Sequence, residues 1–165
     1  KRGLMVVTTG NKSEMSVGYA TLYGDMCGGY SVLKDVYKTT VYTLCRWRNA
    51  YRPGVARGPD GPVMPDRVIT KAPSAELKPG QTDQDTLPPY ERLDTVLMAL
   101  IEEQAGVGDV IARGYDRAVV ERVNHMLYNA EYKRRQSSPG VKRSAMSFGR
   151  DRRYPIVNKF RTKRE

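Results

Sequence analysis

The stretch that most constrains the fold lies near the start of the chain. Four consecutive apolar residues, at positions 4–7, lead into the sequence TTGNKSE at positions 8–14. An apolar run that ends in small polar residues predicts a buried strand, followed by a loop and the first turn of a helix. A strand that is apolar on both faces is typical of a parallel sheet covered on both sides. Ligands of such sheets bind outside the carboxyl ends of the strands, so residues 8–14 are a candidate site.

The rest of the sequence offers few partners for this strand. A parallel sheet needs several strands joined by crossover helices, yet the only other candidate is a weak one at residues 68–70. The sequence also opens with Lys1 rather than Met, and enters its one clear strand within a few residues. We therefore expect an α/β fold of which this chain is the C-terminal portion, mostly helical, with the other strands upstream or in another chain.

Helices account for most of the remaining pattern. We expect one from a cap at Asn11 or Ser13 to about residue 22, one from a cap at Asp35 to about 49, and further helices at 90–104, at 107–113 and from a cap at Asp116 to about 135. The spacing of apolar residues is clearest at 90–104. Prolines and glycines mark 52–65 as a loop, and 71–89 is a second long stretch without periodicity.

The second of these helices is expected to pack through one apolar stripe. Trp47 is expected to close it against the rest of the fold. The stripe consists of Val36, Tyr37, Val41, Leu44 and Cys45.

The charge of the chain indicates an anionic partner. Its 28 Lys and Arg residues exceed its 18 Asp and Glu residues, which gives a net charge of +10. Twelve of the cations and only three acids lie in residues 131–165, so the first 130 residues are nearly neutral. Nucleotides, nucleic acid and acidic surfaces are all compatible partners. The tail from Gln136 onward is basic and aperiodic, but few aromatic residues are interleaved for base stacking, which weakens the nucleic-acid alternative.

Two cysteines and no long apolar run limit the cellular setting. No stretch approaches the roughly 20 apolar residues of a membrane-spanning helix. Cys27 and Cys45 do not form a disulfide-scaffold pattern, so we expect reduced thiols and a cytoplasmic protein. The single histidine, His125, has no second His or Cys at metal-ligand spacing.

The residues at the candidate site suit a nucleotide. Backbone N–H groups at a helix start face an anion, and a carboxylate such as Glu14 can hold a divalent metal that carries phosphate. By spacing alone the signal is weak, and a plain strand-to-helix turn is the favoured interpretation. In that case Glu14 is a helix-start carboxylate that contributes up to about 1 kcal/mol, and Lys38 is a solvated lysine.

Seven blocks in the sequence, taken together, closely resemble the synthetase domain of NAD synthetases, and they occur in the order of that family across almost the whole chain. They are TTGNKSE (8–14), GYATLYGD (18–25), KTTVY (38–42), KAPSAEL (71–77), QTD (81–83), LPPY (87–90) and EYKRRQ (131–136).

The resemblance implies an adenine-nucleotide α-hydrolase-like, Rossmann-like fold and an ATP-dependent amidation. The nicotinate carboxylate of deamido-NAD attacks the α-phosphate of ATP and forms an adenylate, with release of pyrophosphate. Ammonia then displaces AMP and NAD is formed. Mg²⁺ and cationic side chains are expected to neutralise the phosphates as charge shifts during the reaction.

The resemblance also assigns roles to individual residues. Thr9 and Ser74 match positions that contact ATP, and Lys38 matches the lysine on the ATP phosphates. Glu14 matches the acidic residue at the metal and the dinucleotide, and with Lys38 it is a candidate catalytic residue. Asp25 and Lys133 match the deamido-NAD side, although Asp25 could equally be a turn residue.

Two departures from the family pattern stand out. An acidic residue that contacts the dinucleotide in ammonia-only members is replaced here by Gly29. The Ser-Gly-Gly-x-Asp-Ser pyrophosphate loop of the family is absent and is expected upstream of Lys1. We therefore divide the chain into residues 1–135, the C-terminal part of a synthetase domain, and residues 136–165, a basic tail. We also expect the 165 residues alone to be inactive.

The insert at 52–65, the Pro-Pro-Tyr helix start and the sequence FGRDRRYPI at 148–156 resemble the glutamine-dependent branch of the family. This implies an N-terminal glutaminase domain with a Cys-Glu-Lys site, which would send ammonia to the synthetase domain, and a homo-oligomer. The alternatives are an ammonia-only NAD synthetase and, in another class, a basic nucleic-acid-binding or assembly module.

Overall fold

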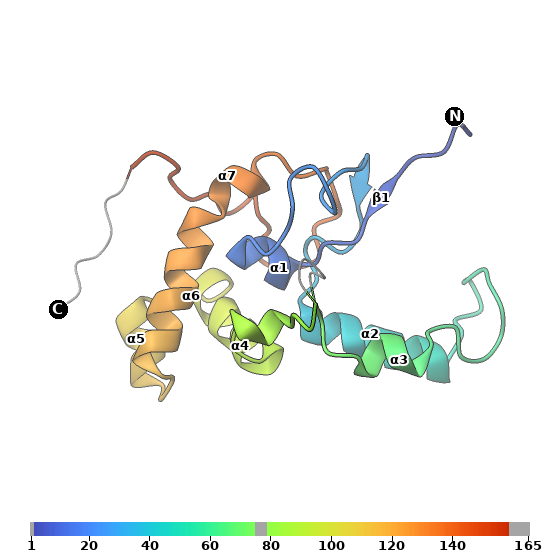
Figure 1. Cartoon of the computed structure of the whole chain (residues 1–165), viewed down its shortest axis with the longest axis horizontal. Helices are drawn as coiled ribbons and strands as arrows, with labels where there is room; N and C mark the ends of the chain where they lie inside the picture. The colour runs from blue at the N-terminus through green and yellow to red at the C-terminus, as the bar shows by residue number, and fades with distance from the viewer. Residues whose placement is uncertain (1, 75–78, 159–165) are drawn as a thin grey trace.

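The structure is a computed structural model, and it describes residues 2–74 and 79–158. Within these residues α4, α5 and α6 gather into a helical cluster with α1 against it, while α2 and α3 extend away as an arm (Figure 1). The elements are β1 (Val7–Thr8), α1 (Lys12–Val17), β2 (Tyr30–Ser31), α2 (Lys38–Ala50), α3 (Asp66–Thr70), the 3₁₀ turn η1 (Asp83–Asp85), α4 (Tyr90–Ile101), α5 (Val107–Ala112), α6 (Arg117–Asn129) and α7 (Glu131–Arg134).

Helix α4 is the centre of the core. The apolar spacing predicted at 90–104 is confirmed, because Leu93, Val96, Leu97 and Ile101 are completely buried. The helix contacts α1, α2, α5 and α6. A site built on the starts of α1 and α2 therefore rests against the helix that contributes the most residues to the buried core of the described chain.

The helices after α4 follow the prediction with one difference. The carboxylate of Asp116 accepts a hydrogen bond from the Val119 amide at 2.9 Å, as expected of the cap of α6. The predicted helix from this cap to residue 135 is nevertheless interrupted at Ala130, where α6 ends and α7 begins. Arg134 turns back and donates to the carbonyl of Leu127 near the end of α6. The spacing of apolar residues gives no indication of this contact.

The strand predicted at residues 4–7 is not buried. Leu4 is 79% exposed and Val7 47% exposed, and only Val7 and Thr8 form β1, which pairs in parallel with β2. Nothing in the described part of the chain covers these apolar side chains. β2 is not among the predicted strands, since two residues are too few to show periodicity. Gly28 lies close to β1, and a Cβ there would be 2.6 Å from the Thr8 methyl.

Helix α1 is shorter than predicted. It was expected to reach about residue 22, but it ends at Val17 because Gly18 adopts the left-handed conformation, with φ of 73°. Its cap is Asn11, one of the two expected.

Helix α2 begins later than predicted and is largely exposed. It starts at Lys38 rather than after a cap at Asp35, and its N-cap residue makes no side-chain cap hydrogen bond. No residue of α2 itself is buried, and of the predicted apolar stripe only Tyr37, which precedes the helix, is buried in the core. Trp47 is 47% exposed and packs on the ring of Tyr51, with centroids 5.5 Å apart, instead of closing the helix against the fold.

The weak strand candidate at 68–70 is helical. It lies in α3, where Pro65 precedes the first turn and Asp66 starts it. The Thr70 hydroxyl donates back to the carbonyl of Asp66 at 2.9 Å. β-branched residues favoured a strand in the sequence, but a proline followed by an acidic residue is also a helix start.

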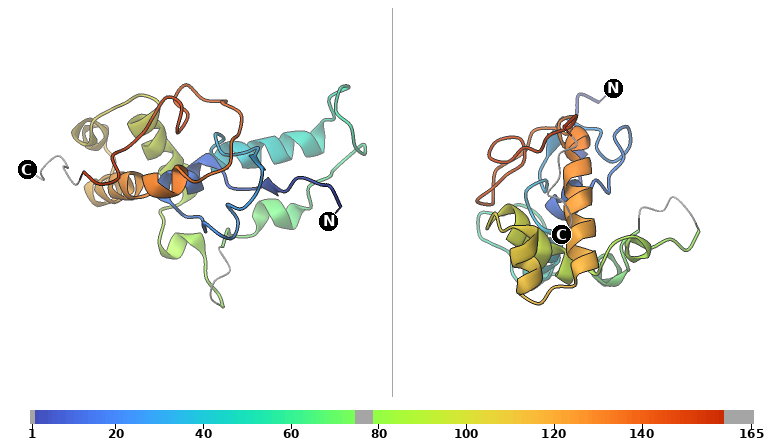
Figure 2. Two further views of the ribbon diagram at one scale, coloured as in Figure 1. Left: turned by 90° about the horizontal axis from the view of Figure 1, so that it is seen from above. Right: turned by 90° about the vertical axis from the view of Figure 1, so that its left-hand side faces the viewer.

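A buried lysine joins the C-terminal segment to α1. The Lys12 ammonium is completely buried and lies 2.9 Å from Asp35 and 2.5 Å from Glu102. It also donates to the Ser144 hydroxyl and the Met146 carbonyl. Asp35 therefore holds Lys12 instead of capping α2. Figure 2 shows the segment after α7 returning over α1.

None of the helices in residues 2–74 and 79–158 is long and apolar enough to cross a membrane.

Replacing Lys12 with alanine should destabilise the chain by about 3–5 kcal/mol, because the buried carboxylate of Asp35 and the half-buried carboxylate of Glu102 then lose their cation. Urea unfolding followed by circular dichroism measures this loss. Arg117→Ala is the matched control, because it removes an exposed ion pair with Glu121 and should change stability by less than about 1 kcal/mol. Equal losses in the two variants would contradict the structural role of Lys12.

Candidate functional site

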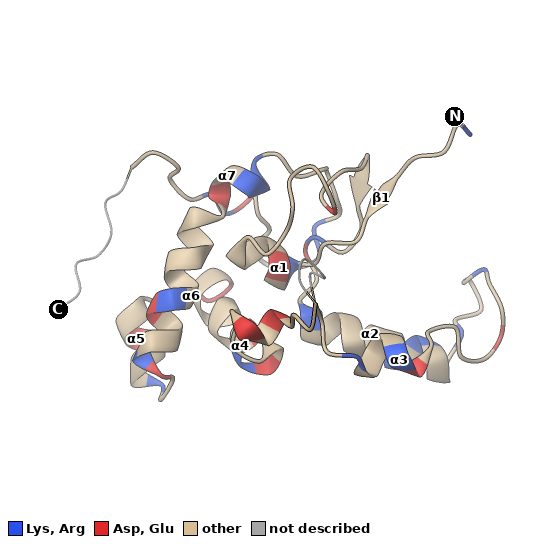
Figure 3. Ribbon diagram, in the orientation of Figure 1, with Lys and Arg blue, Asp and Glu red and all other residues tan. Residues whose placement is uncertain are grey.

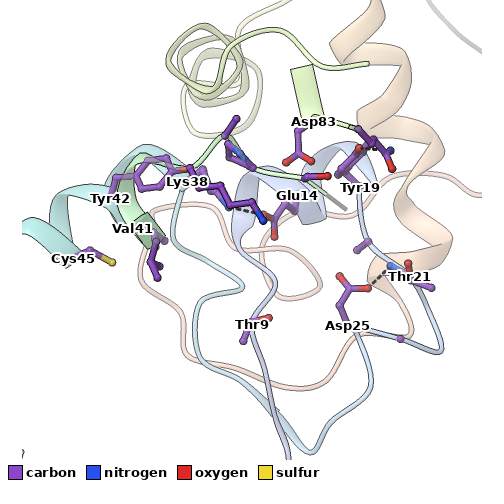
Figure 4. A pocket seen from close by; sticks show the side chains of 18 of the residues that line it. Thr9, Glu14, Tyr19, Thr21, Asp25, Lys38, Val41, Tyr42, Cys45 and Asp83 are labelled. Atoms are coloured by element: carbon purple, nitrogen blue, oxygen red, sulfur yellow. Dashed lines mark hydrogen bonds and ion pairs between the residues drawn. The ribbon is translucent and has the colours of Figure 1, made fainter. Parts of the chain in front are cut away.

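One large cavity gathers all six residues assigned from the sequence. Its volume is about 1130 Å³, and its lining includes Thr9, Glu14, Asp25, Lys38, Ser74 and Lys133. These residues come from the end of β1, from α1 and the loop after it, from the start of α2, from the segment before η1 and from α7 (Figure 4). The cavity therefore unites residues up to 124 positions apart in the sequence.

Glu14 is fixed by the start of α1. It is the third residue of the helix and forms a capping box with Asn11, whose side chain accepts from the Glu14 amide at 3.0 Å. One Glu14 oxygen accepts from the Asn11 amide at 3.1 Å, and the other lies 3.0 Å from the Lys38 ammonium. The capping box thus orients the carboxylate toward the cavity.

Lys38 is the first residue of α2, where a cation is not favoured by the helix dipole. Its ammonium lies over the rings of Tyr42 and Tyr90, at 5.7 and 5.5 Å. Burial alone would lower the pKa of Lys38, but the charge and the hydrogen bond of Glu14 raise it above the usual 10.5. The ion pair consequently keeps Lys38 protonated inside the cavity.

Thr9 and Asp25 lie on the opposite side of the cavity from α2 (Figure 4). Thr9 is exposed directly after β1. The Asp25 carboxylate accepts from the Thr21 amide at 2.6 Å and so closes the turn between these residues. Asp25 is therefore a turn residue that also lines the cavity, and both sequence interpretations describe part of its position.

Lys133 and Ser74 complete the lining. The Lys133 ammonium donates to the carbonyls of Gly18 and Ala20, at 2.8 and 2.7 Å, so it holds the loop that follows α1. Ser74 is half-buried, at the end of the described stretch before η1. The residues that follow it in the block KAPSAEL, 75–77, lie outside the described residues.

Several lining residues were not singled out from the sequence. Asp83 is 3% exposed, and one of its oxygens accepts from the Tyr90 hydroxyl at 2.6 Å. Tyr19, Tyr42 and Arg67 also line the cavity. Asp83 belongs to the block QTD, but the surrounding stretch has no periodicity that would indicate a buried carboxylate. The position of Asp83 beside α4 follows from the fold and not from the local sequence.

The charges around the cavity suit a phosphate-bearing ligand. Among the residues that the structure describes, the lining contains four cations and three carboxylates, with the cations on α2, α3, the segment after α3 and α7. The described residues include no group of three or more His, Cys, Asp or Glu side chains arranged to hold a metal ion. Glu14 could hold a magnesium ion in the usual manner of one carboxylate together with phosphate oxygens and waters.

Comparison with known proteins agrees with this description. The family described as NAD synthase matches residues 1–137. Glutamine-dependent NAD(+) synthetases from Rhodobacter capsulatus and Acinetobacter baylyi are each 53% identical to this chain over 161 residues, which is 98% of the chain. A glutamine-dependent NAD(+) synthetase from Cytophaga hutchinsonii has a similar fold, with a TM-score of 0.69 at 21% identity over 94% of this chain.

The fold and the cavity define a mostly helical, partial α/β chain with a charged cavity at a strand end. This chain belongs to the NAD synthase family. The predicted fold class and family resemblance are confirmed. The chain spans 29% and 28% of the lengths of the two curated relatives, and 24% of the Cytophaga chain.

The ion pair between Glu14 and Lys38 leads to a prediction about the titration of Lys38. Glu14→Gln should lower the pKa of Lys38, because burial still lowers this pKa while the negative charge of Glu14, which raises it, is removed. NMR titration of the lysine side-chain signals measures the change. Because the folded-state pKa is raised, the pair stabilises the fold below the unfolded pKa of lysine, and this contribution is lost as pH rises through the raised value.

Glu103→Gln provides the control, because Glu103 pairs with Arg113 and not with a cavity residue. It should leave the titration of Lys38 unchanged. An unaltered pKa of Lys38 in Glu14→Gln would show that the ion pair is not formed in solution.

Proposed function

We propose that this chain supplies one wall of the active site of a glutamine-dependent NAD synthetase. The reaction is the ATP-dependent amidation of deamido-NAD to NAD through an adenylated intermediate, with AMP and pyrophosphate released. The observation that carries this proposal is the convergence of Thr9, Glu14, Lys38, Ser74, Asp25 and Lys133 on one cavity. The 53% identity to curated glutamine-dependent enzymes supports it.

The proposed roles follow from position and charge. Lys38 binds the phosphates of ATP, and Thr9 and Ser74 contact the nucleotide. Asp25 and Lys133 lie on the deamido-NAD side, where Lys133 also holds the loop between Gly18 and Ala20. A protonated Lys38 in a partly dehydrated cavity stabilises the charge that develops on the phosphates as the nicotinate carboxylate attacks.

Glu14 is the residue that would hold Mg²⁺. When bound, the ion would neutralise phosphate charge and polarise the reacting phosphoryl group. Before the nucleotide enters, Lys38 is the partner of Glu14. The pair keeps both charges compensated within the cavity.

The remaining parts of the proposal concern the whole enzyme. We propose that residues 1–135 belong to the synthetase domain and residues 136–165 form a basic tail. The pyrophosphate loop and the glutaminase domain that supplies ammonia would lie elsewhere in the enzyme. We further propose a cytoplasmic homo-oligomer. The exposed apolar residues around β1 are compatible with cover by other parts of such an assembly.

Nucleic-acid binding by the basic C-terminal region is less well supported. Several of its cations have partners within the chain: Arg134 and Arg135 pair with Glu131, and Lys142 pairs with Asp151 at 2.8 Å. Figure 3 shows lysines and arginines scattered over α2, α3, α6 and α7 among acidic residues rather than along one face. Phosphate-backbone binding needs many free cations on one surface.

In the complete enzyme, Lys38→Ala and Glu14→Ala should each lower turnover by about two to three orders of magnitude, the usual effect of removing a preorganised charge stabiliser. Formation of NAD from deamido-NAD, ATP and ammonia measures this. Ammonia in place of glutamine keeps the glutaminase step out of the result. Arg117→Ala on α6, outside the cavity, should retain normal turnover. Near-normal turnover in both cavity variants would refute the site assignment.

The isolated 165 residues should form no NAD from deamido-NAD, ATP and ammonia, because the cavity lacks the pyrophosphate loop that the proposal places elsewhere. Chromatographic detection of NAD under conditions in which the complete enzyme is active tests this. Product above the no-enzyme background would overturn the proposal that the chain provides only one wall.

A further inference from the structure

The starts of α1 and α2 are tied together by a carboxylate that has no role in the function proposed above. Asp94 lies on α4 and is 2% exposed. One of its oxygens accepts from the Ser13 hydroxyl at 2.5 Å. The other accepts from the Thr39 amide at 2.9 Å and from the Thr39 hydroxyl at 2.8 Å. Asp94 thus lies on α4 and contacts both α1 and α2.

These contacts replace the missing cap of α2. The N-cap residue, Tyr37, makes no side-chain cap hydrogen bond. The first two amides of α2 are instead satisfied from other helices: the Lys38 amide donates to the Ser13 hydroxyl at 2.9 Å, and the Thr39 amide donates to Asp94. The end of α2 that carries Lys38 is therefore positioned by α1 and α4 rather than by its own sequence.

The residues that Asp94 binds are the sequence neighbours of the site residues. Ser13 directly precedes Glu14, and Thr39 directly follows Lys38. The side chains of Glu14 and Lys38 meet at 3.0 Å. A shift of α2 relative to α1 would change this distance, and the hydrogen bonds of Asp94 and Ser13 tie the two helix starts together.

We propose that Asp94 is a positioning residue of the nucleotide site, which acts through Ser13 and Thr39 to fix Lys38 against Glu14. The carboxylate is too deeply buried to contact substrate, so its effect on the reaction is indirect. The inference deepens the proposed function, and its kinetic part rests on that function. Its geometric part concerns only the two helix starts.

Ser13→Ala tests the geometric part without changing any charge. The variant removes the hydroxyl that links Asp94 to the Lys38 amide. We expect the pKa of Lys38 to fall, since the ion pair with Glu14 loosens while the burial remains. Thr43→Ala is the matched control: it removes an exposed hydroxyl from the same helix, one that bonds only to the Thr39 carbonyl, and should leave the titration of Lys38 unchanged.

The kinetic part uses the complete enzyme with ammonia as the nitrogen source. Asp94→Asn and Ser13→Ala should each lower kcat about 10- to 100-fold, the size expected when a reacting group is misplaced. In a Lys38→Ala background either change should lower kcat little further, because both act through Lys38. Val96→Ala, a buried change on the same helix, should lower the melting temperature and leave kcat unchanged.

The outcomes separate the two claims. If Ser13→Ala lowers the pKa of Lys38 in an enzyme that forms no NAD, positioning by Asp94 stands and the proposed function fails. If Asp94→Asn and Ser13→Ala lower only the melting temperature, as Val96→Ala does, and leave the pKa of Lys38 and kcat unchanged, Asp94 is structural and the inference is overturned. Additive losses in the Lys38→Ala background would also overturn it.

Discussion

The candidate site depends on buried charges that hold the short helix α1. Six residues of helix are too few to be stable alone, so α1 owes its position to tertiary contacts. Lys12 ties it to Asp35, to Glu102 at the end of α4 and to the returning C-terminal segment. Ser13 ties it to Asp94. Glu14, the next residue, is consequently presented to the cavity from a fixed backbone.

The sequence predicted those elements whose stability is local. Helix α4 has a continuous apolar stripe, and α6 has a capping aspartate, so periodicity located α4 and cap chemistry located the start of α6. The sequence did not predict where α2 begins, because the N-terminus of α2 is capped by Asp94 and Ser13 from other helices. The exposure of residues 4–7 was missed for a related reason. Apolar composition indicates that a strand favours burial, but it does not show whether other segments pack over it.

The candidate site could be predicted mainly through family resemblance. Spacing alone marked residues 8–14 as a strand end with a useful carboxylate, and it favoured a plain turn over a ligand site. The ordered blocks then identified the six residues that the fold brings to one cavity. Asp83, Tyr19 and Asp94 were not identified, because their importance lies in contacts between segments distant in sequence and not in any local pattern.

The central claim is that nucleotide binds in the cavity between α1, α2 and α7. An experimental structure of the complete enzyme with a non-hydrolysable ATP analogue, deamido-NAD and magnesium tests it most directly. The account predicts phosphate density within hydrogen-bonding distance of the Lys38 ammonium and a metal at Glu14. Nucleotide density elsewhere, with the Glu14–Lys38 pair intact and the cavity filled by solvent, would contradict it.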